Sequence, residues 1–261
     1  MTFALKIWQI LLSLFFWLFV AISSIVLFNI ALVIFFVTLL FDRRGKLLHL
    51  FSCFWAQLYF YLNPFWRLHI DGRSLLPWND AAVLVANHQS VGDILVLYGL
   101  YRPFKWVSKA SMFKVPFVGW NMVINRYVSL VRGNKDSIAK MMRDCKTWLD
   151  LKMPVLMFPE GTRSEDGEIK NFKDGAFRLA IDQNCPVFPI VLSGTRKTLP
   201  KHGIILRENA KCLVTILPAV HPKDFNHDIA KFREHVRLLM CQEKRRLDQT
   251  LMEQSRGRIS T

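Results

Sequence analysis

Cysteine is scarce in this 261-residue chain, and its spacing shows no pairing. The five cysteines are far apart: Cys53, Cys145, Cys185, Cys212 and Cys241. An odd number without paired spacing fits neither a disulfide framework nor a metal site, so we expect reduced thiols in an intracellular protein. No cluster of metal ligands is visible elsewhere, and we expect that neither a metal ion nor another cofactor is needed.

Acidic residues are few. The chain has 20 Asp and Glu against 35 Lys and Arg, a net charge of +15, although 52% of its residues are hydrophobic and the mean hydropathy is +0.21. Positive charge combined with an apolar excess indicates a surface that faces anionic lipid headgroups or phosphorylated substrates. Nucleic acid is the competing partner, but the sequence lacks zinc-finger spacing, a recognition-helix signature and an aromatic RNA-binding motif. We therefore expect no nucleic acid partner.

Residues 7–41 contain no charge, glycine or proline over 35 positions. As one helix this segment would be about 52 Å long, more than the ~30 Å hydrocarbon core of a bilayer. A cleaved signal peptide fits poorly because the apolar stretch is far too long and no small-residue cleavage site follows. A tilted membrane span is the first choice and a re-entrant hairpin the second. Because Arg43, Arg44 and Lys46 outnumber the single Lys6, we expect the rest of the chain in the cytoplasm.

Residues 47–66 are rich in aromatic side chains and are interrupted by Pro64. Such density is typical of a membrane–water boundary, so we expect a helix in or just under the headgroup layer, with a second full span as the alternative. We assign residues 1–66 to a membrane anchor and residues 67–261 to a globular domain.

The globular part alternates short apolar runs with helical patterns. Strands are expected at 66–70, 81–86, 104–108, 127–131, 154–158, 186–192 and 211–217. Helices are expected at 94–101, 136–151 and 172–184, with a loop at 109–120 and a basic helix at 225–250 that docks on the domain or on a bilayer. This order predicts an α/β fold, a mainly parallel sheet covered by helices on both faces.

Residues 87–93 read Asn-His-Gln-Ser-Val-Gly-Asp and follow an apolar strand. On one regular helix His88 and Asp93 would lie about 140° apart, so they meet only if His88 precedes the helix and Asp93 lies in its first turn. Gly92 would ease such a turn. A carboxylate on one imidazole nitrogen makes the other nitrogen a general base. The alternative is a capping box in which Asp93 only satisfies backbone N–H groups.

A second polar segment, 158–164, reads Phe-Pro-Glu-Gly-Thr-Arg-Ser and also follows an apolar strand. Gly161 permits close backbone approach to a ligand, and the guanidinium of Arg163 suits phosphate. The alternative is a turn in which Thr162 and its neighbours cap the next element.

Together these segments resemble the 1-acylglycerol-3-phosphate O-acyltransferase family. The family's His-x4-Asp motif corresponds to His88 and Asp93, and its Phe-Pro-Glu-Gly-Thr-Arg-Ser motif stands unchanged at 158–164. Residues 127–132 resemble its second motif, but Val131 replaces the usual Asp, so no role for that carboxylate carries over. Residues 187–194 resemble its fourth motif, and Lys109 with 116–119 fits the segment between the first two. The likeness spans about 81–196.

The resemblance implies a glycerolphosphate acyltransferase-like fold. It also implies transfer of a fatty acyl group from a thioester, on coenzyme A or acyl carrier protein, to the hydroxyl of lysophosphatidate. His88 and Asp93 would be catalytic. The residues expected to bind substrate are Glu160, Gly161, Thr162, Arg163, Arg132 and Lys109. Glycerol-3-phosphate or another lysolipid is the alternative acceptor, and a non-catalytic membrane lipid-binding protein is the rival outside the enzymes.

Overall fold

A seven-stranded sheet organises the chain, for which a computed structural model describes residues 3–198 and 209–256. Its spatial order is β1-β7-β6-β2-β5-β3-β4. The strands are β1 (Trp66–Asp71), β2 (Val83–Ala86), β3 (Lys105–Lys109), β4 (Val128–Leu130), β5 (Val155–Met157), β6 (Val187–Ser193) and β7 (Ala210–Ile216). Neighbouring strands run parallel except β6 and β7, which pair antiparallel. The predicted mainly parallel sheet is confirmed.

The central strand β2 is buried on both faces, as an apolar run in a parallel sheet should be. Val83 and Val85 contribute to one hydrophobic cluster, while Leu84 and Ala86 contribute to the other. This alternation follows from the period of two in a strand, which sends successive side chains to opposite faces.

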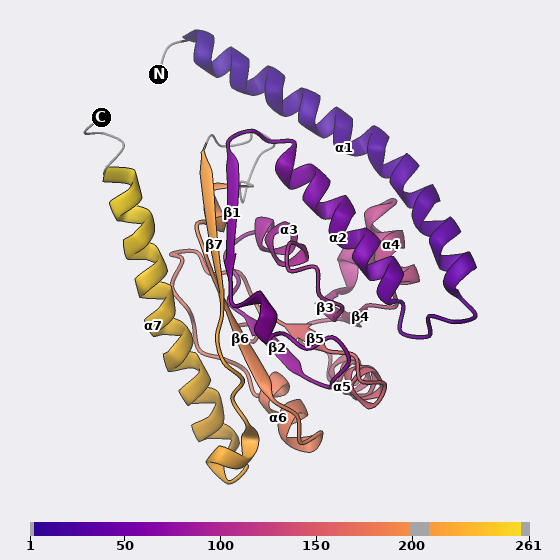
Figure 1. Ribbon diagram of the computed structural model, residues 1–261, viewed down its shortest axis with the longest axis vertical. Helices are drawn as coiled ribbons and strands as arrows, with labels where there is room; N and C mark the ends of the chain where they lie inside the picture. Colours follow the sequence, from indigo (N-terminus) through magenta and orange to yellow (C-terminus); the bar gives the residue numbers. More distant parts are fainter. Residues whose placement is uncertain (1–2, 199–208, 257–261) are drawn as a thin grey trace.

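Helices cover both faces of the sheet (Figure 1). One face carries α2 (Lys46–Tyr61), α3 (Gly92–Tyr98) and α4 (Val118–Ile124), and the other carries α5 (Lys135–Asp150), α6 (Gly175–Asp182) and α7 (Ile229–Arg256). Short 3-10 turns lie at η1 (Arg73–Leu75), η2 (Ala110–Lys114), η3 (Thr195–Lys197) and η4 (Pro222–Phe225). The expected loop at 109–120 was therefore wrong, since η2 and the start of α4 lie there.

The long helix α1 (Phe3–Thr38) lies outside α2 and packs against α2 and α4 (Figure 1). Phe16, Leu27 and Ala31 form part of its buried stripe. Its segment Ile7–Thr38 is long and apolar enough to cross a membrane, and only 17% of its most apolar window is buried. A core helix would be mostly buried, so this exposed apolar surface points to association with a membrane.

The aromatic helix α2 differs from the expected interfacial helix because most of its aromatic residues face inward. Trp55, Tyr59 and Phe60 are buried between α1 and the domain, whereas Phe54 and Tyr61 are exposed. The N-terminal helices and the sheet thus share one hydrophobic cluster.

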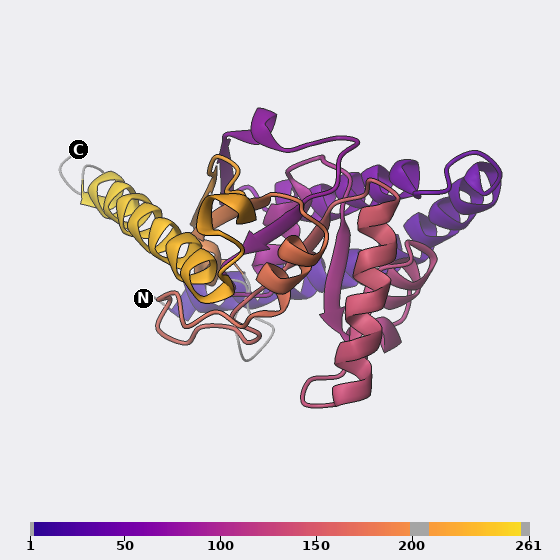
Figure 2. The same ribbon diagram turned by 90° about the horizontal axis from the view of Figure 1, so that it is seen from below.

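The C-terminal helix α7 docks on the domain. Phe232, Val236, Met240 and Leu247 are buried against the face of the sheet that α5 and α6 also cover. Seen from below, its C-terminal end extends away from the other elements (Figure 2).

Candidate functional site

His88 lies in the loop that joins β2 to α3, at the C-terminal end of a central parallel strand. Ligands of parallel α/β sheets bind at this edge. Gly92 begins α3. Close packing, and not an unusual backbone turn, is the reason for a glycine at this position. A Cβ there would lie 1.9 Å from Thr198 Oγ1, so only glycine lets α3 approach the turn after β6.

The structure brings His88 and Asp93 together. His88 Nδ1 lies 2.7 Å from Asp93 Oδ2, and the exposed fractions of the two side chains are 12% and 0%. The same carboxylate oxygen accepts hydrogen bonds from the backbone N–H groups of Gln89 (2.6 Å) and Ser90 (2.9 Å). Asp93 therefore caps the loop and contacts the imidazole at once. The catalytic role of the pair stays a prediction. Because Nδ1 is engaged, Nε2 is the ring nitrogen left for a substrate.

Glu160 connects the 158–164 segment to the His88 loop through the backbone. Its Oε1 accepts from the His88 N–H at 2.8 Å, and its Oε2 accepts from the Lys170 N–H at 3.0 Å. Burial raises the pKa of this carboxyl, and the two backbone donors act in the opposite direction. Glu160 thus holds the loop that carries His88 in place.

Two further contacts fasten the motif segments to one another. The ring of Phe158 stacks on the His88 imidazole, with centroids 4.0 Å apart and planes at 15°. The Ser164 N–H donates to the His88 carbonyl at 2.8 Å. With the Glu160 bond, the ring and both backbone groups of His88 are tied to residues 158–164.

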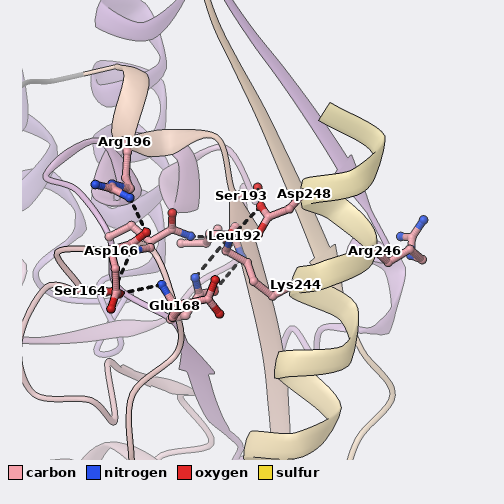
Figure 3. A network of polar contacts seen from close by, with 12 residues as sticks. Ser164, Asp166, Glu168, Leu192, Ser193, Arg196, Lys244, Arg246 and Asp248 are labelled. Atoms are coloured by element: carbon pink, nitrogen blue, oxygen red, sulfur yellow. Dashed lines mark hydrogen bonds and ion pairs between the residues drawn. The ribbon is translucent and has the colours of Figure 1, made fainter. Parts of the chain in front are cut away.

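A network of polar contacts links the His88 loop to the end of β6 and to α7 (Figure 3). The Asn87 amide accepts from Leu192 N at 2.7 Å and donates to Leu192 O at 3.0 Å. The next residue, Ser193, donates to Asp248 of α7, and Lys244 also binds Asp248. These contacts join the start of the His88 loop, the end of β6 and the C-terminal helix.

A second part of the network holds the loop that follows the 158–164 segment (Figure 3). The Arg196 guanidinium donates to the carbonyl oxygens of Glu165 and Asp166. Ser164 Oγ donates to Asp166 at 2.7 Å and accepts from Gly167 N at 3.0 Å. Arg196 follows β6 directly, so the strand end and the loop are fixed relative to each other.

A cavity of about 460 Å³ opens beside the imidazole. Its lining includes His88 and three cationic side chains, Lys109, Arg132 and Arg163. None of these three cations forms an ion pair with another described residue. The rest of the lining is mainly apolar and comes from α1, α2, α3, α4 and the ends of β3 and β5, including Phe16, Val20, Trp55, Leu95, Trp106 and Met122. A cavity whose lining combines three cations with mainly apolar side chains suits an amphiphile that carries a phosphate.

The other predicted site residues, the catalytic Asp93 and three residues expected to bind substrate, lie outside this lining. Asp93 and Glu160 are buried behind His88, and Thr162 is exposed. Gly161 has φ +72, and a Cβ there would approach the Lys173 side chain to 2.9 Å. The substrate-binding roles of Glu160, Gly161 and Thr162 stay predictions.

No local pattern indicates the Phe158 stack, the Arg196 contacts or the Ser193–Asp248 bond, because each joins residues that are far apart in the chain. All five cysteines lie outside the cavity lining, and burial raises the pKa of Cys145, Cys185 and Cys212 to about 12. Within residues 3–198 and 209–256, no three His, Cys, Asp or Glu side chains gather so that they could hold a metal ion.

Comparison with known proteins bears on this geometry. Residues 67–193 match the family model described as Acyltransferase. The chain is 39% identical over 180 residues to the chloroplastic 1-acyl-sn-glycerol-3-phosphate acyltransferase LPAT1 of Arabidopsis thaliana. The aligned region covers 67% of this chain and 50% of the Arabidopsis protein. Residues 67–193 are an acyltransferase-family domain. Another relative in this family, the 1-acyl-sn-glycerol-3-phosphate acyltransferase of Saccharomyces cerevisiae, is 34% identical over 162 residues, 59% of this chain and 52% of that one.

The fold of the chain also matches a solved structure. The crystal structure of the 1-acyl-sn-glycerophosphate acyltransferase PlsC from Thermotoga maritima superposes with a TM-score of 0.77, over 93% of this chain and 97% of that one, at 24% identity. The chain spans about half the length of the plant and yeast relatives.

Proposed function

We propose that this chain transfers a fatty acyl group from a thioester to the free hydroxyl of lysophosphatidate, producing phosphatidate. One arrangement carries the proposal: an imidazole fixed by a carboxylate at 2.7 Å, beside a mainly apolar cavity that is also lined by three cations without an ion pair to another described residue. The family match and the names of the Arabidopsis and yeast relatives support the same acceptor.

The reaction begins at His88 Nε2, which takes the proton of the acceptor hydroxyl as a general base. General base catalysis by a positioned side chain contributes about 10²–10⁴-fold in rate. Asp93 keeps Nδ1 protonated and stabilises the imidazolium that forms, because its Oδ2 accepts the Nδ1–H hydrogen bond.

The acceptor oxygen then attacks the thioester carbonyl carbon directly. The new C–O ester bond forms, the C–S bond breaks, and the leaving sulfur takes the proton from the imidazolium. No acyl-enzyme on cysteine is needed. The cysteine thiols lie away from the cavity, and their raised pKa disfavours the thiolate that would act as nucleophile.

Lys109, Arg132 and Arg163 bind the phosphate of the acceptor in this scheme, since all three line the cavity with His88. The apolar part of the cavity shelters acyl carbons, each of which gains about 0.8 kcal/mol on leaving water. The donor is a thioester of coenzyme A or of acyl carrier protein. The cluster of Arg43, Arg44 and Lys46 after α1 favours a domain on the cytoplasmic side of the membrane.

A direct assay tests the activity. The purified chain is given lysophosphatidate with each thioester donor in turn, and release of free thiol and formation of phosphatidate are followed. Glycerol-3-phosphate and lysolipids without a phosphate monoester are the comparison acceptors. We expect lysophosphatidate to be used best, and a chain that releases no thiol with either donor contradicts the proposal.

His88→Ala tests the mechanism in the same assay. We expect kcat to fall by about 10²–10⁴-fold while thermal unfolding stays cooperative. Asp93→Asn should also lower kcat strongly, because the ring loses the partner that fixes its tautomer. A His88→Ala chain that keeps wild-type turnover contradicts the assignment of the base.

A further inference from the structure

A short apolar surface on α4 lies beside the long helix α1. Residues 115–124 carry no charge, and Lys114 and Arg126 lie at the two ends of this segment. Val115, Val118, Trp120 and Val123 are all exposed although they are large and hydrophobic. Large apolar patches on a protein surface mark sites of contact with a partner or a membrane.

The backbone directly before α4 adopts a strained turn at Phe117. Val118 N donates to Pro116 O at 2.7 Å, and Phe117 between them has φ 60 and ψ −57. This is the rare γ-turn with positive φ, which is costly for a bulky residue and persists only where its surroundings enforce it. Such strain gathers at functional positions.

The strained turn joins α4 to α1 through aromatic rings. Phe117 lies against Phe28 of α1 with centroids 6.0 Å apart, and Trp120 lies 5.6 Å from Phe28 and 5.0 Å from Phe117. Along α1 other large apolar side chains are exposed as well, Ile25 and Val33 among them. The exposed apolar surface therefore continues from α1 onto α4 without a charged residue between Val115 and Ile124.

The charged residues around this apolar surface indicate which partner covers it. Lys109, Lys114, Arg126 and Arg132 are exposed around α4, a pattern that complements anionic headgroups. A second copy of the chain is disfavoured because each copy carries a net charge of +15. A phospholipid leaflet satisfies both the apolar surface and its cationic rim.

We propose that residues 115–124, which we name the α4 face, insert into the same phospholipid leaflet as α1 and form a second membrane contact of the catalytic domain. The α4 face also reaches the cavity, because Val118 is exposed and lines the cavity together with Asn121 and Met122 of the same helix. An acyl chain can then pass from the leaflet into the cavity between α1 and α4. This entry route for the acyl chain rests on the proposed function, whereas the membrane contact itself does not.

Site-directed labelling tests the contact on the full chain. Four cysteines are buried, so a Cys241→Ser background leaves no partly exposed thiol among them. An environment-sensitive fluorophore is placed by Val123→Cys (55% exposed), by Leu238→Cys on α7 (54% exposed) as the matched control, and by Val33→Cys on α1 (62% exposed) as the lipid reference. α7, which carries position 238, lies across the sheet from α1 (Figure 1).

The labelled chains are bound to vesicles of phosphatidylcholine and phosphatidylglycerol with and without nitroxide-labelled lipid. An apolar helix face lies about 5–10 Å into the headgroup and acyl boundary. We therefore expect blue-shifted emission and nitroxide quenching at position 123 close to those at position 33, with neither at position 238. Quenching at 33 but not at 123 overturns the proposal. So does disulfide crosslinking of unlabelled Val123→Cys chains on vesicles, which would assign the α4 face to a second copy.

A charge substitution provides an independent readout. Val123→Glu should raise the apparent KM for long-chain acceptor presented in vesicles by about tenfold or more, since a buried carboxylate at a lipid interface is costly. Turnover with a short-chain, water-soluble acceptor should be unchanged, and Leu238→Glu should change neither. Equal vesicle kinetics for Val123→Glu and Leu238→Glu would overturn the proposal even if the enzyme is fully active.

Discussion

The imidazole of His88 and the phenyl ring of Phe158 lie face to face, with centroids 4.0 Å apart. One ring belongs to the loop after β2 and the other to the end of β5, two neighbouring parallel strands. The stack resists tilting of the imidazole plane, while the contact between Nδ1 and the Asp93 carboxylate fixes the direction of the ring within that plane. Both constraints hold Nε2 in one direction, which a general base requires before the substrate arrives.

Phe158→Leu should therefore lower kcat. An aromatic pair contributes about 0.5–1.5 kcal/mol beyond its burial, so we expect a fall of about 2–10-fold with little change in the acceptor KM. Phe172→Leu is the matched control, since Phe172 is buried in the other hydrophobic cluster, and it should lower Tm without lowering kcat. Steady-state kinetics and thermal melts separate the two. Equal kcat values for both variants would argue against a positioning role for Phe158.

Arg163→Ala should mainly weaken binding of the acceptor. Arg163 lines the cavity and has no ion-pair partner among the described residues, so its guanidinium is available to a phosphate. Losing a charged hydrogen bond of about 1.5–3 kcal/mol predicts an acceptor KM raised by about 10–100-fold. Lys109→Ala and Arg132→Ala should act in the same direction, and Arg178→Ala on the exposed side of α6 should not. A fall in kcat at unchanged KM would contradict the phosphate assignment of Arg163.

The local part of the site could be predicted from the sequence because few residues separate its members. The offset of five positions from His88 to Asp93 rules out one helix face and favours a loop followed by a first turn, and the two side chains do meet in that way. The strand before each motif was also predictable, since β2 and β5 are continuous apolar runs.

The parts that the sequence did not reveal depend on contacts between distant segments. Pro116 and Gly119 read as loop residues, yet Gly119 lies inside α4, where a Cβ would come within 2.5 Å of Met112 O. The wall that Phe16 of α1 adds to the cavity has no local signature, because an apolar helix reads the same whether lipid or protein covers it. The β1–β7 pairing joins the first and last strands, which no periodicity indicates.

Glu160→Gln distinguishes a structural role from the predicted contact with substrate. Both carboxylate oxygens accept backbone N–H groups, but glutamine has one acceptor oxygen and would place its NH₂ group against the other donor. Leaving a buried group unsatisfied costs about 1–3 kcal/mol, which corresponds to about 2–4 °C in Tm per kcal/mol. We expect a lower Tm and a lower kcat with a similar acceptor KM. A raised KM at an unchanged Tm would instead support direct binding of the acceptor by Glu160.

Lys105 gives the stability of the fold a pH dependence. Its ammonium is fully buried, donates to Asn125 O at 2.7 Å and lies 4.3 Å from the centre of the Trp148 ring. Burial, reinforced by the charge of Arg126, lowers the pKa of Lys105 from 10.5 to about 7. Between these two values the unfolded chain holds a proton that the folded chain has released, so the free energy of unfolding rises with pH.

The slope from this one proton is at most about 1.4 kcal/mol per pH unit, and it vanishes below pH 7, where both states are protonated. Urea unfolding of the wild type and of Lys105→Met in detergent, from pH 6 to 9.5, measures the effect. The difference in unfolding free energy, wild type minus variant, should stay constant up to about pH 7 and then increase. Lys140→Met on the exposed side of α5 controls for the loss of one positive charge. A difference that stays flat across this range would mean that the buried ammonium keeps its proton, held by Asn125 O and the Trp148 ring.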